Sequence, residues 1–266
     1  MSIERSPLPE GATLVETIPY QLTRRLLREI LPRRGALEVT GRGGTGKTFT
    51  VDDYFARNPA LDLVKIHLEA KVRGNGFLRR LVEELGGKPD PSWDGQRLMK
   101  ELRALVGPRR LYVYVDEADL LNRDSLRQIR YLRDQRDLHI AWVLVGTTFA
   151  NAYRLVPELW SRVTRRVTFD SLAGDALTGA LAAYHPFLAA ADPAILARID
   201  EEHCQGNWRV WSEVLPDLLD YAARLETDGL TTAVAAAVLG VTVDRNRAKP
   251  KRGGPVRPAR RKAAQA

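Results

Sequence analysis

A glycine-rich segment at residues 41–48 (GRGGTGKT) places the strongest constraint on how this chain folds. It matches the P-loop pattern G-x-x-x-x-G-K-[ST] at every fixed position. A strand-like run at 36–40 precedes it and a helical pattern at 49–57 follows it, which is the context that the pattern requires. Glycines let successive backbone N–H groups turn inward around phosphate oxygens, and the following helix adds free N–H groups. The sequence therefore predicts a phosphate site between a strand and a helix.

The residues expected to contact the nucleotide are those of the loop and the first position after it: Gly41, Arg42, Gly43, Gly44, Thr45, Gly46, Lys47, Thr48 and Phe49. Lys47 is expected to reach the β- and γ-phosphates, and the Thr48 hydroxyl to ligate Mg²⁺. Asp116 and Glu117 follow a buried apolar strand at 111–115 (LYVYV). A carboxylate at that edge can hold Mg²⁺ through its water shell, which assigns Asp116 to the metal. Glu117 is then placed to polarise the attacking water as a general base.

A further strand-like run at 61–68 lies between the P-loop and this acidic pair. That order favours ATPase-type P-loop proteins over the simpler nucleotide kinases. ATP and Mg²⁺ are therefore the expected cofactors, and hydrolysis of ATP to ADP and phosphate is the expected reaction. The alternative for the acidic pair is two surface acids at a strand end.

Strand-like and helical patterns alternate along the first two thirds of the chain. The expected strands are 36–40, 61–68, 111–115, 140–145 and 166–169, and the expected helices between and before them are 20–30, 49–57, 77–85, 96–106 and 125–132. This alternation predicts an α/β fold with a three-layer, mostly parallel sheet. The domains expected are an N-terminal extension at 1–12, a nucleotide-binding α/β domain at 13–170, a small all-helical lid domain at 171–244 and a disordered basic tail at 245–266.

Composition excludes several classes of protein. With 44% hydrophobic and 28% charged residues, the 266-residue chain is too apolar to be wholly disordered. Its single cysteine, Cys204, rules out an internal disulfide framework and a multi-cysteine zinc site. The N-terminus lacks the features of a signal peptide, and the longest near-apolar run, 231–243, is too short to cross a bilayer. We expect a cytoplasmic protein without a membrane partner.

Positive charge is concentrated at the C-terminal end of the sequence. The formal charge is +8, and nine of the 41 basic residues lie in 245–266, which contains no acidic residue. The remaining 32 basic and 33 acidic residues give 1–244 a formal charge of −1. A tail of this composition, which includes Lys251 and Arg252, commonly binds polyanions by neutralising phosphates. The alternative is a tail that only improves solubility.

Taken together, GRGGTGKT, LYVYVDEADLL, IRYLRD, VLVGTTF, LWSRV and GNWRVW resemble the motifs of AAA+ ATPases, and more narrowly those of transposition regulators of the MuB, TnsC and TniB type. The resemblance covers roughly residues 13–220. It implies ATP-dependent assembly of a homo-oligomer, as a ring or a helical filament, around double-stranded DNA, and recruitment of a transposase or integrase partner. MuB has an additional N-terminal DNA-binding domain that this sequence lacks, so the chain is more similar to a minimal TnsC form.

Three further residues are assigned to catalysis on this resemblance. Thr147 occupies the place of the polar sensor; the alternative is a helix N-cap, for which Thr147 and Thr148 are equally suited. Arg162 is positioned as a finger that reaches the γ-phosphate of a neighbouring subunit; Arg165 and Arg166 are close enough to confuse that assignment, and a solvated basic patch is the alternative. Arg209 lies near an expected helix start, where a sensor would reach back to the nucleotide of its own subunit.

The same resemblance places duplex DNA along the inner surface of the oligomer. The residues expected to line that surface are Lys71, Arg73, Asn75, Arg123 and Arg127. Apart from the resemblance, Arg79 and Arg80 extend this set into a local cluster of positive charge. The alternative interpretation of the cluster is an ordinary solvated helix face. The sequence contains no recognisable recognition helix or zinc finger, so we expect phosphate binding without sequence preference.

Two other functions remain open at this point. An origin-binding or helicase-loading AAA+ protein would use the same nucleotide chemistry, but such proteins usually add a winged helix, for which 225–244 leaves little room. A nucleotide-gated scaffold would bind ATP and partners with negligible turnover. The rate of ATP hydrolysis with and without duplex DNA separates the regulator from the scaffold.

Overall fold

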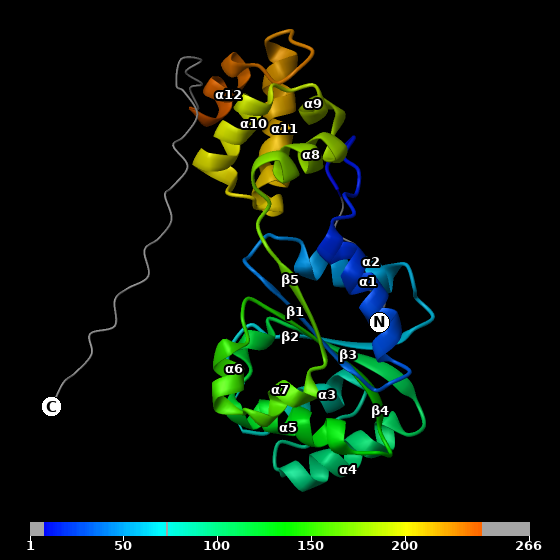
Figure 1. Ribbon diagram of the computed structural model, residues 1–266. Coiled ribbons are helices and arrows are strands. Elements are labelled where there is room, and N and C mark those ends of the chain that lie inside the picture. The colour runs from blue at the N-terminus through cyan, green and yellow to red at the C-terminus, as the bar shows by residue number, and fades with distance from the viewer. Residues whose placement is uncertain (1–7, 73, 241–266) are drawn as a thin grey trace, which may run out of the picture.

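The computed structural model describes residues 8–72 and 74–240, and a five-stranded sheet forms its centre (Figure 1). The strands are β1 (Ala36–Gly41), β2 (Asp62–His67), β3 (Arg110–Asp116), β4 (His139–Gly146) and β5 (Arg165–Phe169). They lie in the order β2-β3-β4-β1-β5, and every neighbouring pair is parallel. In this order β4 separates the P-loop strand β1 from the strand β3 that carries Asp116.

Helices cover both faces of the sheet (Figure 1). The helices of this part are α1 (Ile18–Ile30), α2 (Lys47–Ala56), α3 (Gly76–Glu84), α4 (Gly95–Val106), α5 (Arg123–Asp134), α6 (Ala150–Leu155) and α7 (Glu158–Arg162), with a 3₁₀ turn η1 (Ala118–Leu120) after β3. Helices α1 and α2 pack on one face, and α3 to α7 lie on the other. The predicted three-layer parallel α/β fold is confirmed.

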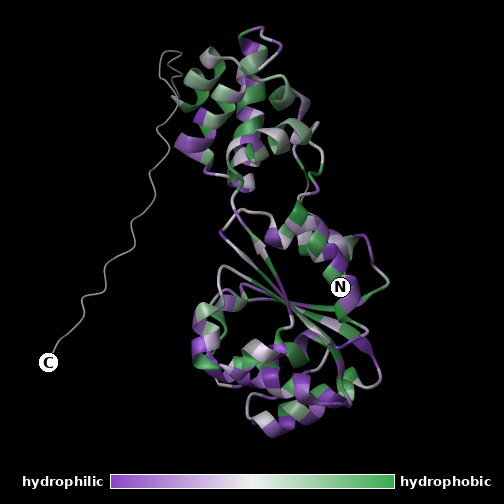
Figure 2. Ribbon diagram, viewed as in Figure 1, coloured by the Kyte–Doolittle hydropathy of each residue, from purple (hydrophilic) through white to green (hydrophobic). Residues whose placement is uncertain are grey.

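Side chains of the central strands alternate between two hydrophobic cores. Tyr112 and Tyr114 of β3 pack with α1 and α2, whereas Leu111, Val113 and Val115 face the helices on the other side. All five side chains are essentially buried, which explains why this strand is continuously apolar in sequence. Figure 2 shows hydrophobic and hydrophilic positions mixed on the helices and on the outer strands. A register slip of one residue would exchange the two sets, so the two cores together determine the register.

A separate bundle of helices follows β5 (Figure 1). It consists of α8 (Gly174–Tyr184), α9 (Pro186–Ala189), α10 (Pro193–Ile199), the π-helical turn η2 (Asp200–Cys204), α11 (Trp208–Arg224) and α12 (Thr232–Leu239). Its core surrounds the fully buried Trp211 and includes the buried Cys204. Among residues 171–240 no strand is formed, as the sequence predicts.

The segment before α1 packs against this helical bundle. Leu8, Ala12 and Val15 contact the hydrophobic core of the bundle. The backbone N–H of Thr13 donates a hydrogen bond to the carbonyl of Tyr184 over 2.7 Å. The described part of the predicted 1–12 extension therefore joins the helical part, an arrangement that the sequence pattern did not indicate.

Several helices begin earlier than the sequence pattern predicts. Helix α2 starts at Lys47 rather than at 49, because Gly46 adopts a left-handed conformation with φ of 95° and turns the loop directly into the helix. Helix α5 starts at Arg123 rather than at 125, since the Asn122 side chain caps it by accepting from the backbone N–H of Ser125 over 2.8 Å.

The described helices include none that is long and apolar enough to cross a membrane.

Replacement of Tyr112 by Phe is expected to lower the free energy of unfolding by about 1 kcal/mol. The buried hydroxyl donates a 2.6 Å hydrogen bond to the Leu27 carbonyl, and burial raises its pKa above the usual value. Urea denaturation measures the change. Tyr131→Phe, at a position that is 48% exposed, is the matched control and should change stability by less than about 0.5 kcal/mol. Equal effects of the two substitutions would contradict this account.

Candidate functional site

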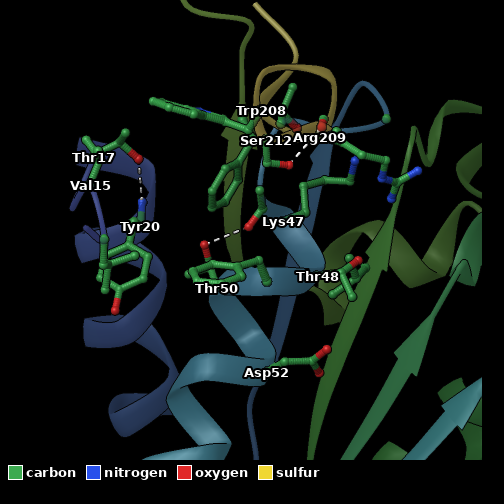
Figure 3. Close-up of a pocket in the computed structure, with 18 of the residues that line it drawn as sticks. Val15, Thr17, Tyr20, Lys47, Thr48, Thr50, Asp52, Trp208, Arg209 and Ser212 are labelled. Carbon is green, nitrogen blue, oxygen red and sulfur yellow. Dashed lines mark hydrogen bonds between the residues drawn. The ribbon is translucent and has the colours of Figure 1, made fainter. Parts of the chain in front are cut away.

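A cavity of about 410 Å³ opens between the P-loop, the N-terminal segment and the helical bundle (Figure 3). Residues 43–50 form its phosphate end, together with Asp116, Glu117 and Thr147. Its other walls come from Leu8, Pro9, Thr13, Leu14, Val15, Thr17, Tyr20, Asp52, Val145, Gly146, Phe169, Tyr184, Trp208, Arg209 and Ser212. Segments from the two ends of the described chain thus meet at one site.

The P-loop is held in shape by the side chain of Lys47. Its Nζ donates hydrogen bonds to the carbonyls of Gly41 and Arg42, over 2.6 and 2.7 Å. Burial lowers the pKa of the Lys47 ammonium, and the carboxylates of Glu117 and Asp116 oppose that shift. The lysine therefore sits within the electrostatic reach of both acids at the end of β3, as the motif predicts.

Thr48 and Asp116 present oxygen atoms to each other across the P-loop. The Thr48 hydroxyl donates to Asp116 Oδ1 over 3.2 Å, and Asp116 is 5% exposed at the last position of β3. Its other oxygen, Oδ2, lies 3.5 Å from Nδ1 of His67. A hydroxyl and a carboxylate are ligands of the kind that Mg²⁺ prefers. These residues fit the predicted Mg²⁺ site, with Thr48 and Asp116 as the metal-holding pair.

Glu117 lies immediately after β3 in a strained backbone conformation. Its φ of 54° and ψ of 38° fall in the left-handed region, which non-glycine residues seldom adopt. Its backbone N–H donates to Asp116 Oδ1 over 3.1 Å, and its side chain is exposed at the cavity. Strain of this kind is often retained where a side chain must be presented to a ligand.

Thr147 follows β4 and lines the cavity beside the P-loop. Its carbonyl accepts from the N–H of Gly41 over 3.3 Å, and its own N–H donates to Oδ1 of Asp119 over 3.2 Å. Thr148 Oγ1 accepts from the N–H of Ala150 over 3.3 Å, but the N-cap position of α6 is Phe149, which makes no side-chain capping hydrogen bond. The geometry thus places Thr147 at the phosphate end, next to the strand that carries Asp116.

Arg209 reaches the P-loop from the helical bundle. It is the second residue of α11 and lines the cavity. Its charge acts together with burial, the larger cause, to lower the pKa of Lys47. Figure 3 shows the Lys47 and Arg209 side chains on one side of the cavity, opposite Thr17 and Tyr20. The structure therefore brings Arg209 to the cavity beside the P-loop.

Arg162 is not brought to this cavity. Its Nε lies 2.9 Å from Oδ1 of Asp134, at the C-terminal end of α5, and the arginine side chain is 39% exposed. The neighbouring Arg165 pairs with Glu29 on the other face of the sheet, at 3.9 Å. Arg162 therefore lies where α7 meets α5, away from the cavity.

Arg166 faces a buried carboxylate on β1. Its Nε lies 3.6 Å from Glu38 Oε2, and the hydroxyl of Tyr153 also bonds to that carboxylate. Burial raises the pKa of Glu38 to about 7, and Arg166 opposes the shift. Arg166 and Arg162 are thus each paired with a carboxylate of the same chain, Glu38 and Asp134.

The predicted DNA-binding residues that the structure describes lie on the loop before α3 and on α5. Lys71, Arg123 and Arg127 are exposed. The Asn122 side chain donates to the carbonyl of residue 72, which ties the loop to the start of α5. Asn75 accepts from Gln128 Nε2 over 3.1 Å, so it links α3 to α5. Arg73, Lys251 and Arg252 lie outside the described residues.

The sequence suggests that Arg79 belongs to a cluster of positive charge. In the structure, the guanidinium of Arg79 is instead bound by a loop of the same chain. Its guanidinium donates hydrogen bonds to the carbonyls of Pro89, Asp90, Pro91 and Trp93. Five fixed donors on a planar group suit this use, because they satisfy several carbonyls of one irregular loop. Arg79 is therefore a structural residue of the 88–94 loop.

Sequence reasoning missed the wall of the cavity opposite the phosphate end. Trp208 and Tyr184 of the helical bundle contact each other edge to face, with ring centroids 5.4 Å apart. Leu14 and Val15 complete this apolar wall from the N-terminal side. The only signal in the sequence was the tryptophan of GNWRVW beside the already selected Arg209. An apolar wall with aromatic rings suits the base of a nucleotide.

Comparison with known proteins bears on the fold. Residues 31–153 match a family model described as AAA domain. Comparison with curated proteins gives no match. Among solved structures, Cdc6p from Pyrobaculum aerophilum superposes with a TM-score of 0.65 at 19% identity, over 90% of this chain and 70% of that one.

Two further solved structures are similar over most of the described chain. ORC1 of Aeropyrum pernix, solved in complex with DNA, gives a TM-score of 0.58 at 18% identity, over 85% of this chain and 66% of that one. The RuvB Holliday junction branch migration motor of Thermotoga maritima gives 0.55 at 15% identity, over 83% and 67%. At these identities the similarity shows the fold. The chain has a P-loop fold of the AAA+ type, and the narrower resemblance to transposition regulators stays a prediction.

Replacement of Thr48 by Ala is expected to remove the Mg²⁺-dependent part of nucleotide affinity. The variant should bind ATP ~10-fold more weakly than the parent in Mg²⁺ and equally in EDTA, because only the hydroxyl facing Asp116 is lost. Isothermal titration calorimetry measures both conditions. Thr48→Ser retains the hydroxyl and serves as the control. A loss of affinity that is the same in EDTA would reject the metal assignment.

Proposed function

We propose that this protein is an ATP-hydrolysing AAA+ ATPase that assembles on duplex DNA without sequence preference and regulates transposition. The observation that carries the proposal is one cavity in which Lys47, Thr48, Asp116, Thr147 and Arg209 converge. These residues come from four separate parts of the chain. Their convergence supports nucleotide chemistry rather than a chance glycine-rich turn.

In the proposed reaction, water attacks the γ-phosphorus of ATP and the bond to the β-phosphate oxygen breaks, which yields ADP and phosphate. Glu117 accepts a proton from the attacking water. Lys47 and Arg209 stabilise the negative charge on the phosphates, and Thr147 orients the γ-phosphate. Mg²⁺, held by Thr48 and Asp116, supplies further charge neutralisation when it is bound.

The proposed active form is a homo-oligomer, either a ring or a helical filament. The cavity contains a sensor arginine from its own subunit, whereas Arg162 lies outside it on the α5 and α7 surface. An arginine finger supplied by a neighbour is an established way to complete a P-loop ATPase site. Asp134 holds the Arg162 guanidinium through two contacts, 2.9 Å from Nε and 3.4 Å from Nη2. The ion pair with Asp134 keeps the Arg162 side chain extended at the surface.

Double-stranded DNA is the proposed polyanion. Exposed Lys71, Arg123 and Arg127 lie on a loop and a helix that the Asn122 side chain ties together. Contacts of this type neutralise phosphates and carry no sequence information. The basic tail, with Lys251 and Arg252, adds to the same electrostatic attraction.

The role in transposition, with a transposase or integrase as partner and a cytoplasmic location, rests on the resemblance of sequence motifs to MuB, TnsC and TniB. The fold similarity to Cdc6p and to the DNA-bound ORC1 favours a second candidate, an origin-binding or helicase-loading ATPase. The two differ in DNA preference, because an origin-binding protein selects a sequence. A nucleotide-gated scaffold is the third candidate and predicts negligible turnover with or without DNA.

Replacement of Glu117 by Gln is expected to preserve ATP binding, slow hydrolysis ~100-fold or more and trap the oligomer on DNA. Phosphate release and sedimentation with plasmid DNA and ATP measure the two effects. Lys47→Ala, which removes the phosphate contact, is the control and should form no DNA-bound oligomer. Equal rates of hydrolysis by Glu117→Gln and the parent would refute the assignment of Glu117 as the general base. A parent that stays monomeric with ATP and plasmid would refute the assembly.

Replacement of Arg127 by Gln is expected to weaken binding to every duplex sequence to a similar degree. It should also reduce the slope of log affinity against log salt by ~0.9, since one phosphate contact is lost. Fluorescence anisotropy with two unrelated duplexes at several salt concentrations measures both. Arg224→Gln, on the exposed side of α11, should leave the slope unchanged. An unaltered slope for Arg127→Gln would remove α5 from the DNA surface.

A further inference from the structure

A tight turn of the helical bundle lies between the P-loop and the segment that leaves β5. Gln205 and Gly206 adopt left-handed conformations, with φ of 51° and 70°. At Gly206 a Cβ atom would lie 2.6 Å from the carbonyl oxygen of Leu172, so the turn packs against the connection between β5 and α8. Only glycine fits this position, because both its conformation and its surroundings exclude a side chain.

A buried carboxylate holds this turn. Asp200 Oδ1 accepts from the N–H of Gly206 over 2.7 Å and from Nε1 of Trp211 over 3.0 Å. The Asp200 carbonyl accepts from the N–H of Gln205 over 2.6 Å. Asp200 lies in the π-helical turn η2, and such turns recur at functional sites. Three hydrogen bonds therefore fix the backbone immediately before α11.

On its other side the turn contacts the P-loop directly. The N–H of Trp208, at the start of α11, donates to the Gly44 carbonyl over 2.8 Å. The Asn207 side chain covers Gly44, where a Cβ atom would lie 1.7 Å from Asn207 Oδ1. Gly44 itself has a φ of 75°. One glycine of the P-loop thus receives both a hydrogen bond and a side chain from the helical bundle.

Asn207 performs a second task at the same time. Its Oδ1 accepts from the N–H groups of Arg209 and Val210, over 3.0 and 3.3 Å, and so caps α11. The two residues that follow it both line the cavity: Trp208 belongs to the apolar wall, and Arg209 lies on the Lys47 side. The position of Asn207 on the P-loop therefore determines where both of them lie.

We propose that Asn207 is a positioning residue that couples the helical bundle to the P-loop, so that ATP affinity depends on the contact of its side chain with Gly44. The proposal rests on the proposed nucleotide function. It assigns to Asn207 a role that helix capping alone does not require. With the contact in place, the P-loop backbone, the aromatic wall and Arg209 are held in one arrangement before ATP binds. The conformational entropy lost on binding ATP is therefore smaller.

Asn207→Ser separates the two tasks, because serine caps helices well but is too short to cover Gly44. The variant is expected to raise Kd and KM for ATP ~10-fold, with kcat changed less than ~2-fold and little change in Tm. Thr231→Ala is the matched control, since Thr231 caps α12 in the same bundle and does not line the cavity. It should lower Tm and leave Kd for ATP unchanged. Parent-like ATP affinity in Asn207→Ser would overturn the proposal.

A double-mutant cycle tests the contact itself. Gly44→Ala, Asn207→Gly and the double variant are compared by calorimetry with ATP. Side chains in contact give non-additive effects. If the two substitutions acted independently, the factors by which each raises Kd for ATP would multiply. The double variant is expected to have a Kd at least ~5-fold lower than that product. Additive losses would overturn the coupling, whereas a parent protein that binds no ATP would instead refute the proposed function.

Discussion

The parallel direction of all five strands is the constraint on which the site depends. Parallel strands point their carboxyl ends to one edge of the sheet, and ligands of such sheets bind at that edge. Here β1 ends at Gly41, β3 at Asp116 and β4 at Gly146, and the P-loop, Glu117 and Thr147 follow directly. Since helices bury both faces, the strands cannot change register without exposing apolar side chains. The position of the groups that line the cavity is therefore a consequence of how the two cores are packed.

The cavity is completed by segments that the sheet does not contain. The N-terminal segment and the helical bundle hold each other through the Thr13 to Tyr184 hydrogen bond and supply the apolar wall. The bundle also contacts the P-loop through the turn before α11. A movement of the bundle would change the phosphate end and the apolar wall together. Such linkage suits a protein whose assembly depends on the bound nucleotide.

The P-loop, the strand before Asp116 and the helical region after residue 170 were predictable because each is a local pattern. Glycine spacing and apolar runs both act over short distances along the chain. Arg79 was misjudged for the opposite reason, since the carbonyls that hold it belong to a loop with no regular pattern. Arg162 was expected between a helix and the last strand; it is the last residue of α7, and its partner Asp134 comes from another helix, which no local pattern indicates.

The sequence by itself determined the class of fold and the position of the P-loop, because the backbone geometry of GRGGTGKT and the burial of LYVYV are properties of contiguous residues. Only the tertiary structure decided that Asn207 covers Gly44 and that Leu14, Tyr184 and Trp208 face one cavity. Those contacts join residues far apart in the chain. They depend on how the bundle packs against the edge of the sheet, and that packing is a sum of many weak contacts that leaves no local pattern in the sequence.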